Sequence, residues 1–332
     1  MSILITGGTG FVVLNLAEHL LADGEDVILF ALCGPAPRVT AHLESLRGKL
    51  MVIEGDVRDG PALDRALADG AIDRVIHAAA VTAGPERERA DFTGVMDVNI
   101  NGTLRLLEAT QKARVGRVLM LSSVAVYGQA TGAGRELDED ETPARPTTLY
   151  AITKHAAEQL TLRYADTFGL DVRVARVGAV FGRWEHPTGL RDTMSVPFQL
   201  AVKVMRDEEA RLPPAAPKDW IYAPDLARAL SGLVSCKHPQ FRIYNAGPGH
   251  VWRIEDCALA LQRSFPRFRW RTVESAAAAN ISYHGSLARP PMAIERMRRQ
   301  TGFAPRFDVN AAFADYAAWL KEYPDLVERL PQ

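Results

Sequence analysis

The chain has 332 residues, of which 47% are hydrophobic and 24% charged, and its formal net charge is −1. These values are ordinary for a globular protein and exclude a disordered or fibrous chain. At about 150 residues per domain, the length allows two domains or one domain with a lobe. Because there is no basic excess, neither nucleic acid nor an anionic membrane surface is expected as a partner.

The cysteines and the N-terminus indicate the compartment. The number and spacing of Cys33, Cys236 and Cys257 fit neither a disulfide framework nor a metal site. We therefore expect a reduced, cytoplasmic setting and no bound metal. The first residues lack the features of a signal peptide, and no apolar stretch reaches the roughly 20 residues that a membrane span needs. A soluble intracellular protein is expected.

Short apolar runs alternate with helical patterns through the first half of the chain. The expected strands are 3–5, 27–30, 50–53, 74–77, 117–121 and 171–176. The two longest expected helices are 95–113 and 148–168. Strands that alternate with helices form parallel β-α-β units, and continuous apolar strands are covered on both faces. The sequence therefore predicts an α/β fold with a doubly wound parallel sheet, in which ligands bind at the carboxyl ends of the strands.

The second half is less regular. It contains a proline-rich segment at 183–219 and an expected strand at 241–245. Helical patterns occur at 223–235, 253–263 and 309–321. We expect residues 1–180 to form the sheet domain, with 220–246 returning to it. Residues 181–219 and 247–332 are expected to form a smaller, mostly helical lobe that binds substrate.

The first strand runs into Gly7-Gly8-Thr9-Gly10 and then into a helix. Small residues in such a turn let backbone N–H groups approach a phosphate, and the helix N-terminus adds partial positive charge. A bare turn without a ligand has the same pattern. Its position at the start of a β-α-β chain favours a dinucleotide.

Two positions depart from the usual dinucleotide pattern. Val13 stands where a third glycine usually lets the helix pack closely on the strand. Ala31 stands at the end of the second strand, where an acidic residue usually binds the adenine ribose. The sequence therefore leaves NAD and NADP both open. Arg38 is a candidate for a 2′-phosphate, although a solvated loop arginine is the simpler interpretation.

Tyr150 and Lys154 are four residues apart at the start of an expected helix, so both side chains project from one face. A free tyrosine has a pKa of about 10, and a nearby cation together with an oxidised nicotinamide lowers it toward neutrality. Tyr150 is then a general base. Ser123, at the end of the fifth strand, is placed to polarise the same substrate oxygen. A surface Tyr–Lys pair is the alternative interpretation.

These motifs together resemble the extended short-chain dehydrogenases/reductases, the NAD-dependent epimerase/dehydratase family. The matching segments occur in family order and spacing over nearly the whole chain: 6–11, 55–57, 77–80, 99–103, 123–128, 150–154, 176–182, 219–222 and 244–247. The resemblance implies a Rossmann domain with a smaller C-terminal substrate lobe. It also implies Ser123, Tyr150 and Lys154 as catalytic residues, and a homodimer formed through the two long helices.

The resemblance further implies where ligands bind. The residues expected to contact NAD or NADP, besides Tyr150 and Lys154, are Gly7, Thr9, Gly10, Phe11, Val12, Asp56, Val57, Ala78, Ala79, Ala80, Asn99, Leu121, Val177 and Val180. The residues expected to contact a small-molecule substrate are Ser123, Val124, Tyr150, Ala179, His186, Arg191 and Lys218. His77 follows a buried strand, and we interpret it as a structural histidine.

Several positions in the family's motifs carry other residues in this chain, and these differences bear on which reaction is catalysed. Val124 and Ala125 stand where 4,6-dehydratases carry an acidic pair, so dehydration is not expected. Nucleotide-sugar enzymes usually have Asn and Arg at the positions of Ala179 and Lys218. These differences favour a smaller substrate without excluding a nucleotide sugar.

The loop 183–193 follows where the family binds substrate. Arg191 or His186 is a candidate for binding a carboxylate or a phosphate. Alternatively, these side chains pair with Glu185 or Asp192 and order the loop.

Three functions remain open. The first is an NAD(P)-dependent dehydrogenase that oxidises a secondary alcohol of a sugar, sugar acid or related polyol. The second is a nucleotide-sugar epimerase. The third is a degenerate family member that binds nucleotide without catalysis, supported only by Val13 and Ala31 and opposed by the intact Ser123, Tyr150 and Lys154.

Overall fold

A seven-stranded sheet forms the centre of the computed structural model, which describes residues 2–68, 71–128, 136–283 and 289–328. Its strands are β1 Ser2–Thr6, β2 Asp26–Ala31, β3 Leu50–Glu54, β4 Ile72–His77, β5 Arg117–Ser123, β6 Val172–Val177 and β10 Ile243–Ala246. They are all parallel, in the order β10-β6-β5-β4-β1-β2-β3. This arrangement confirms the predicted doubly wound Rossmann fold.

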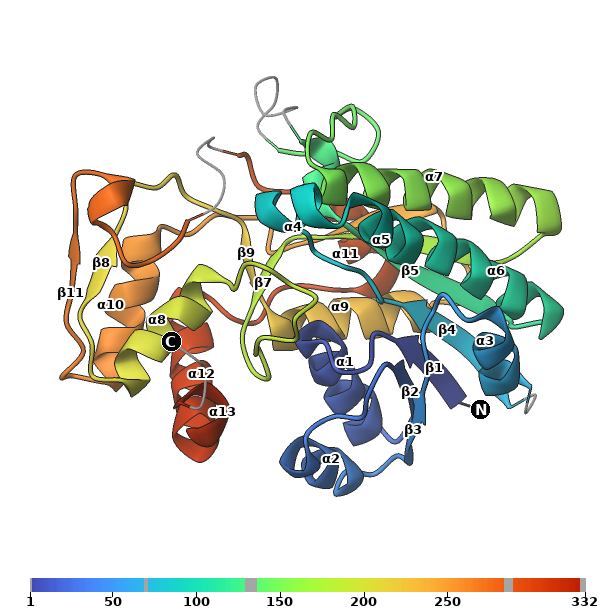
Figure 1. Ribbon diagram of the computed structural model, residues 1–332, viewed down its shortest axis with the longest axis horizontal. Coiled ribbons are helices and arrows are strands. Elements are labelled where there is room, and N and C mark those ends of the chain that lie inside the picture. The colour runs from blue at the N-terminus through green and yellow to red at the C-terminus, as the bar shows by residue number, and fades with distance from the viewer. Residues whose placement is uncertain (1, 69–70, 129–135, 284–288, 329–332) are drawn as a thin grey trace.

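Helices cover both faces of this sheet (Figure 1). On one face lie α1 Phe11–Ala22, α2 Pro37–Glu44 and α9 Ala223–Ser235, and on the other lie α3 Gly60–Leu67, α6 Gly102–Lys112 and α7 Leu149–Phe168. Successive strand residues point to opposite faces. Ile3 therefore packs in the core beneath α1 and α9, and Leu4 in the core beneath α3 and α6.

The helix expected at 95–113 is interrupted. The structure contains α4 Pro85–Ala90, α5 Phe92–Met96, a π-helical turn η1 Asp97–Asn101, and then α6. The carboxamide of Asn99, inside the π-turn, accepts from the Val81 N–H at 2.8 Å and donates to the Val81 carbonyl at 3.0 Å. Such turns often occur at functional sites, and this one ties the helix to the chain leaving β4.

The smaller lobe lies on the left of Figure 1. It contains α8 Val196–Met205, α10 Ile254–Ser264, α12 Val309–Glu322 and α13 Asp325–Glu328, with β8 Ala210–Leu212 paired to β11 Trp270–Thr272. A second short pair, β7 Ala179–Phe181 and β9 Trp220–Tyr222, joins the lobe to the sheet domain. The remaining short helices are η2 Val124–Tyr127, η3 Ala276–Ala278 and α11 Glu295–Thr301.

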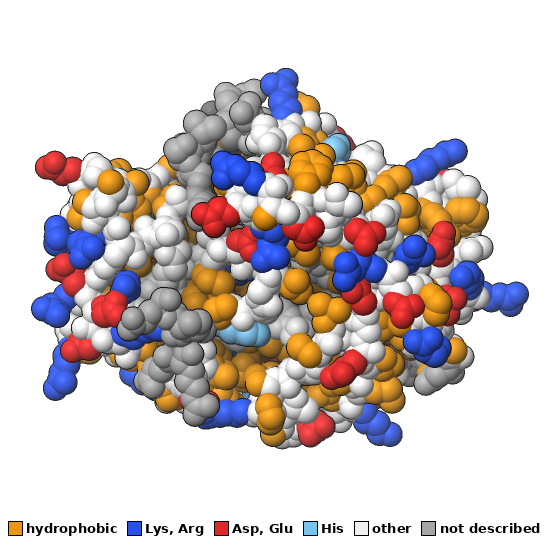
Figure 2. Space-filling model, viewed as in Figure 1, with side chains coloured by type: hydrophobic (Ala, Val, Ile, Leu, Met, Phe, Trp, Pro, Cys, Tyr) orange, Lys and Arg blue, Asp and Glu red, His pale blue; other side chains and the backbone are white. Residues whose placement is uncertain are grey.

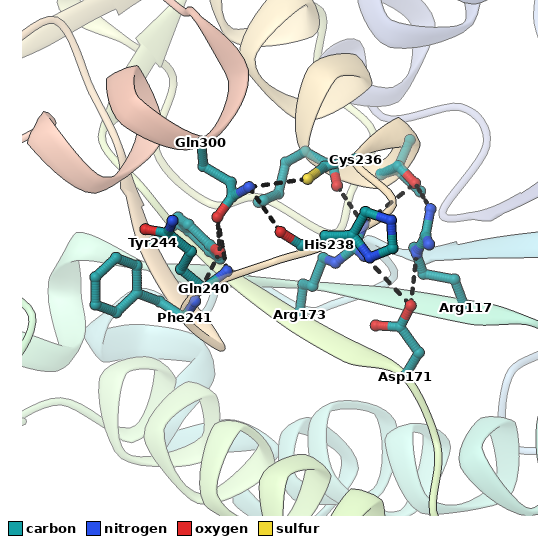
Figure 3. A network of polar contacts seen from close by, with 11 residues as sticks. Arg117, Asp171, Arg173, Cys236, His238, Gln240, Phe241, Tyr244 and Gln300 are labelled. Carbon is teal, nitrogen blue, oxygen red and sulfur yellow. Dashed lines mark hydrogen bonds and ion pairs between the residues drawn. The ribbon is translucent and has the colours of Figure 1, made fainter.

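A polar network fastens the C-terminus of α9 to the sheet (Figure 3). Arg173 of β6 is fully buried and donates to the Leu233 carbonyl at 2.6 Å, and Arg117 of β5 donates to the Val234 carbonyl at 2.7 Å. Gln300 of α11 donates to the Cys236 sulfur at 3.0 Å. Guanidinium groups satisfy carbonyls at a helix C-terminus and complement its dipole, so this network fixes α9 against the sheet.

The three cysteines, Cys33, Cys236 and Cys257, are free thiols. None of the described helices is long and apolar enough to cross a membrane, and no described group of three His, Cys, Asp or Glu residues has the arrangement of a metal site. Acidic and basic side chains are interspersed over the face shown in Figure 2, as the near-zero net charge requires.

Candidate active site

The glycine turn after β1 forms an open cradle at the N-terminus of α1. Gly7 has a φ of +77°, and a Cβ there would lie 3.0 Å from the backbone of Ala79. Gly10 precedes α1 without a side-chain cap, and the first turn of α1 contains no acidic residue. The N–H groups of that turn therefore face an anion site. This cradle fits the pyrophosphate of a dinucleotide.

Val13 does not force α1 away from the sheet. Its side chain is 2% exposed and belongs to the core between α1, α9 and the sheet, together with Leu29. The side chain is therefore accommodated within the core.

One cavity of about 570 Å³ opens at the carboxyl ends of the strands. It is lined at one end by Gly7, Thr9, Gly10, Phe11, Val12, Asp56, Val57, Ala78, Ala79, Ala80, Leu121, Val177 and Val180. Near its other end it is lined by Ser123, Val124, Tyr150, Lys154, Ala179, His186, Arg191 and Lys218. The structure therefore brings the residues selected from the sequence together in one cavity, with the exception of Asn99.

Asn99 lies in a buried polar network behind the cavity wall. Besides Val81, its carboxamide donates to the Thr153 hydroxyl at 3.0 Å, and Thr153 donates to the Tyr150 carbonyl at 2.9 Å. His77 bridges the hydroxyls of Thr6 and Thr103 at 2.8 and 2.9 Å. Burial lowers the pKa of His77 to about 3, helped by the charge of Lys154. His77 is thus a neutral structural residue, as interpreted from the sequence, and Asn99 supports the helix that carries Tyr150.

Ala31, at the end of β2, lines the cavity, with no acidic side chain at that position. Asp56 is oriented by Arg58, whose backbone N–H and guanidinium Nη2 donate to it at 2.9 and 2.6 Å, and these bonds lower the pKa of Asp56 despite partial burial. Arg38 instead pairs with Asp325 and donates to the Glu322 carbonyl at 2.6 Å. Arg38 lies on α2, is directed to the C-terminal helices and is not among the residues that line the cavity, so it fits neither the 2′-phosphate nor the solvated-loop interpretation.

Tyr150 begins α7 and is hydrogen bonded to Ser123 and Thr82. Burial raises the pKa of Tyr150 above its usual value, while these two hydrogen bonds and the charge of Arg191 act in the opposite direction. The sequence interpretation assigned that lowering to Lys154 and the nicotinamide. Within the chain, the charge of Arg191 stabilises the phenolate form of Tyr150. This charge offsets the effect of burial on the pKa of Tyr150 only in part.

Lys154 lies one helical turn after Tyr150 and is 4% exposed. Burial lowers its pKa to about 8, and the charge of Glu158 acts in the opposite direction. Glu158 is fully buried, accepts from the Ser122 hydroxyl at 2.9 Å, and accepts from Arg176 at 2.6 and 3.1 Å. This anion stabilises the cationic form of Lys154, because opposite charges attract strongly in a buried site.

The loop 183–193 closes one side of the cavity. Glu185 is fully buried and accepts from Arg191 at 3.0 Å, from the Ser195 N–H at 2.7 Å and from the Ser195 hydroxyl at 2.7 Å. Asp192 pairs with Arg87 at 2.7 Å outside the cavity. Arg191 therefore pairs with Glu185, as the alternative interpretation expected, yet its side chain also lines the cavity.

Three cations, Arg191, Lys218 and Arg289, line this cavity, and the charges of both arginines act on Lys218. Burial and the charges of Arg289 and Arg191 lower the pKa of Lys218 to about 8. Arg289 pairs with Asp219, which is 1% exposed. Held cations in a partly enclosed site attract an anionic ligand.

Thr82 and Arg289 are among the lining residues that the sequence interpretation missed. Thr82 follows the Ala78–Ala80 run, and Arg289 precedes two prolines. For Arg289, a basic residue at the edge of a proline break in the substrate lobe was the available signal. Thr82 had none, because its role depends on pairing with the distant loop 183–193.

The fold and the cavity together define a dinucleotide-binding protein of the Rossmann class, with a Tyr–Lys pair in the lining of the cavity. A family model for the NAD-dependent epimerase/dehydratase family matches residues 3–247. The chain belongs to this family, which confirms the resemblance noted in the sequence and agrees with the expected nicotinamide cofactor.

Relatives of known activity align over nearly their whole length. The UDP-glucose 4-epimerase of Neisseria gonorrhoeae is 26% identical and covers 98% of both chains. The dTDP-glucose 4,6-dehydratase of Streptomyces griseus is 26% identical and covers 97% of this chain and 94% of its own. The solved structure of UDP-glucose 4-epimerase from Bifidobacterium longum, in complex with NAD+ and UDP, superimposes with a TM-score of 0.82 at 23% identity, over 98% of this chain and 99% of that chain.

Proposed function

We propose that the chain is an NAD-dependent oxidoreductase that transfers hydride at a secondary alcohol of an anionic sugar, with a sugar acid as the leading substrate class. The observation that carries this proposal is that Arg191, Lys218 and Arg289 line the same cavity as Tyr150. A carboxylate or a phosphate offers these cations an anionic hydrogen-bond acceptor, which a neutral polyol does not.

The proposed roles follow from the positions of the side chains. Bound NAD supplies the hydride acceptor, and the glycine cradle, Asp56 and the Ala78–Ala80 backbone hold it. Ser123 donates a hydrogen bond to the oxygen of the substrate alcohol. The ionised phenol oxygen of Tyr150 then accepts the proton of that alcohol. Ser123, Thr82 and Arg191 stabilise the phenolate. Lys154, with its charge maintained by Glu158, would bind the ribose next to the nicotinamide.

The second candidate, a nucleotide-sugar epimerase, is supported by the same cations and by the relatives that act on UDP-sugars.

Dehydration is opposed by the lining of the cavity. Among the described residues that line it, the only carboxylate belongs to Asp56, at the adenosine end. A carboxylate beside Tyr150, such as a dehydratase would need for acid–base work on carbon, is absent from that part of the chain.

A substrate screen separates these candidates. The chain is incubated with NAD and with free sugars, sugar acids and UDP-sugars, and NADH absorbance and product stereochemistry are both recorded. Stoichiometric NADH with a sugar acid supports the dehydrogenase, and an inverted product without net NADH supports the epimerase. Weak NAD binding without any reaction would support the non-catalytic alternative.

We further propose a homodimer that forms through α5 and α7. Apolar side chains are exposed on both helices, among them Phe92 at 52%, Ile152 at 48% and Phe168 at 50%. The two helices contact each other, so their exposed apolar groups belong to one side of the molecule. Such apolar surface commonly marks an interface.

A further inference from the structure

We infer that Glu18 of α1 and Trp184 are positioning residues, which together fix the loop 183–193 in the conformation that brings His186 and Arg191 to the cavity. Neither Glu18 nor Trp184 is among the residues that line the cavity, so both act through the loop. The inference rests on the proposed function in one respect, because it takes this loop to be part of the substrate site.

Three side chains on one face of α1 point to the loop. Phe11, Asn15 and Glu18 are three or four residues apart, the spacing that places side chains on one side of a helix. The ring centre of Phe11 lies 5.0 Å from the guanidinium of Arg191, and Asn15 Nδ2 donates to the Arg183 carbonyl at 2.8 Å. The helix whose N-terminus forms the glycine cradle therefore also contacts both ends of the loop.

Glu18 makes the shortest of these contacts. Its carboxylate accepts from the indole Nε1 of Trp184 at 2.6 Å and lies 3.5 Å from Nη1 of Arg183. Burial acts to raise the pKa of Glu18. Hydrogen bonds from His42 and Trp184, together with the nearby guanidinium charge, outweigh burial and hold this pKa below its usual value. The acceptor is therefore an anion, and a hydrogen bond to an anion is about twice as strong as a neutral one.

The backbone of Trp184 requires such support. Its φ is +63°, in the left-handed region, where a bulky side chain is rare and persists only when surrounding contacts fix it. The indole is 2% exposed, and its ring centre lies 5.3, 5.3 and 4.9 Å from those of His42, Trp319 and Tyr323. His42 belongs to α2, and Trp319 to α12. The indole thus fixes the turn between the sheet domain and the smaller lobe.

The residues after Trp184 connect this turn to the cavity. His186 Nδ1 is hydrogen bonded to the Trp184 carbonyl at 2.8 Å. The buried carboxylate of Glu185 accepts from Arg191 at 3.0 Å and from the hydroxyl of Ser195, the N-cap of α8, at 2.7 Å. A change in the direction of the chain at Trp184 would therefore displace both loop residues, His186 and Arg191, that line the cavity.

Hydrogen exchange of the full chain, measured by mass spectrometry, tests whether the indole fixes the loop. Trp184→Phe removes the indole N–H and keeps an aromatic ring. It should speed exchange in peptides covering 183–193 by about tenfold or more, the contribution of a hydrogen bond to a charged group. Trp270→Phe is the matched control, because the Trp270 indole donates to Gln262 at 3.3 Å in the smaller lobe. It should leave exchange in the loop unchanged.

Variants of Glu18 test the other partner of the hydrogen bond. Glu18→Leu removes the acceptor and should speed exchange in the loop as Trp184→Phe does. Glu18→Gln keeps an oxygen that accepts from the indole and should stay within a few-fold of the unmodified chain. The double variant Glu18→Leu and Trp184→Phe should match the larger single effect, because both substitutions remove one hydrogen bond. Additive effects, or a loop as fast in Glu18→Gln as in Glu18→Leu, would overturn the inference.

The functional readout is the split between KM and kcat for the substrate that the screen identifies. Trp184→Phe should raise KM about tenfold. It should keep kcat within a few-fold, because saturating substrate restores the loop, and NAD affinity within a few-fold, because the glycine cradle is untouched. Trp270→Phe should change none of these quantities.

The outcomes separate this inference from the proposed function. Unchanged exchange in the loop or an unchanged KM in Trp184→Phe would overturn the inference and leave the proposed function intact. An equal loss of NAD affinity would show that Trp184 supports α1 as a whole, which would also overturn it. If the screen finds no substrate, the proposed function is refuted, and hydrogen exchange alone decides whether Glu18 and Trp184 position the loop.

Discussion

At the scale of single residues, burial acts against the charged forms of both Tyr150 and Lys154. It raises the pKa of Tyr150 and lowers that of Lys154 to about 8. A phenolate next to an ammonium is therefore stable only where neighbours supply compensating charge and hydrogen bonds. Ser123, Thr82 and Arg191 do so for Tyr150, and Glu158 does so for Lys154.

Tyr150→Phe should abolish hydride transfer, by more than about 100-fold in kcat, because the phenol oxygen carries the proton. NAD affinity should stay within a few-fold, since the glycine cradle and Asp56 hold the cofactor. Single-turnover reduction of NAD and equilibrium NAD binding measure the two effects. Activity within tenfold of the unmodified chain would disprove the assignment of the base.

Glu158→Gln should shift the alkaline limb of the pH profile of kcat/KM to lower pH. Glu158 raises the pKa of Lys154, so its removal lowers that pKa further below about 8, and the Lys154 cation is lost earlier as the pH rises. The buried Arg176 also loses its partner, which costs about 3–5 kcal/mol of stability. Profiles are therefore recorded at low temperature, after circular dichroism has verified folding.

Glu158→Asp is the control for that experiment, because it keeps the negative charge. Its alkaline limb should lie close to that of the unmodified chain. A limb that does not move in Glu158→Gln would show that Glu158 only anchors α7 to β5 and β6.

Ala31→Asp should strengthen NAD binding by roughly tenfold and weaken NADP binding, because a carboxylate accepts from the ribose hydroxyls and repels a 2′-phosphate. Ala31 lines the cavity beside Leu32 and Arg58, so the introduced side chain faces the adenosine end. Titration of both cofactors measures the ratio. An unchanged ratio of NAD to NADP affinity would mean that position 31 does not contact the ribose.

At the scale of elements, α9 connects the sheet domain and the smaller lobe. It packs against α1, and its preceding strand β9 pairs with β7 beside the cavity. The network in Figure 3 holds the far end of α9 through Arg173 and Arg117. The position of the substrate residues that flank β7 and β9 therefore depends on this anchor.

Arg173→Met should lower the free energy of unfolding by about 2–4 kcal/mol, because it leaves the buried Leu233 carbonyl at the end of α9 without its donor. Urea denaturation followed by fluorescence measures the change. Arg242→Met is the matched control, since Arg242 makes an exposed pair with Asp166 and should change stability by less than about 1 kcal/mol. Equal effects of the two substitutions would contradict the anchoring role.

The accuracy of the sequence predictions differs between elements for physical reasons. The long strands of the sheet were predicted to within about two residues, because each is a continuous apolar run between turn residues. The strands β7, β8, β9 and β11 have three residues each, too few to show a periodicity. The π-turn at Asp97–Asn101 was missed because it depends on the contact of Asn99 with Val81.

The same distinction applies to the site. Gly7, Ser123, Tyr150 and Lys154 lie at strand ends and helix starts, where local sequence shows both the structure and the chemistry. Thr82 and Arg289 reach the cavity through contacts between distant segments. Local sequence does not encode such contacts. Asn99 is the opposite case, because it belongs to a recognisable motif but supports the site from behind the cavity wall and does not line it.

At the scale of the whole molecule, the exposed apolar side chains on α5 and α7 predict a dimer. We expect the unmodified chain to sediment as a dimer at micromolar concentration, with an interface of the usual size of about 1,600 Å² in total. The double substitution Ile152→Glu and Leu160→Glu places two charges among these side chains, which are 48% and 36% exposed. It should give a folded monomer, because burying unpaired charges costs several kcal/mol.

Leu259→Glu is the matched control for this prediction. Leu259 is 43% exposed on α10, in the smaller lobe and away from α7 (Figure 1). Its substitution adds the same charge to an equally exposed leucine without touching the proposed interface, so this variant should remain a dimer. Sedimentation velocity distinguishes the species. A monomeric unmodified chain, or a double variant that still dimerises, would exclude α5 and α7 as the interface, because the substituted side chains would then face solvent in every species.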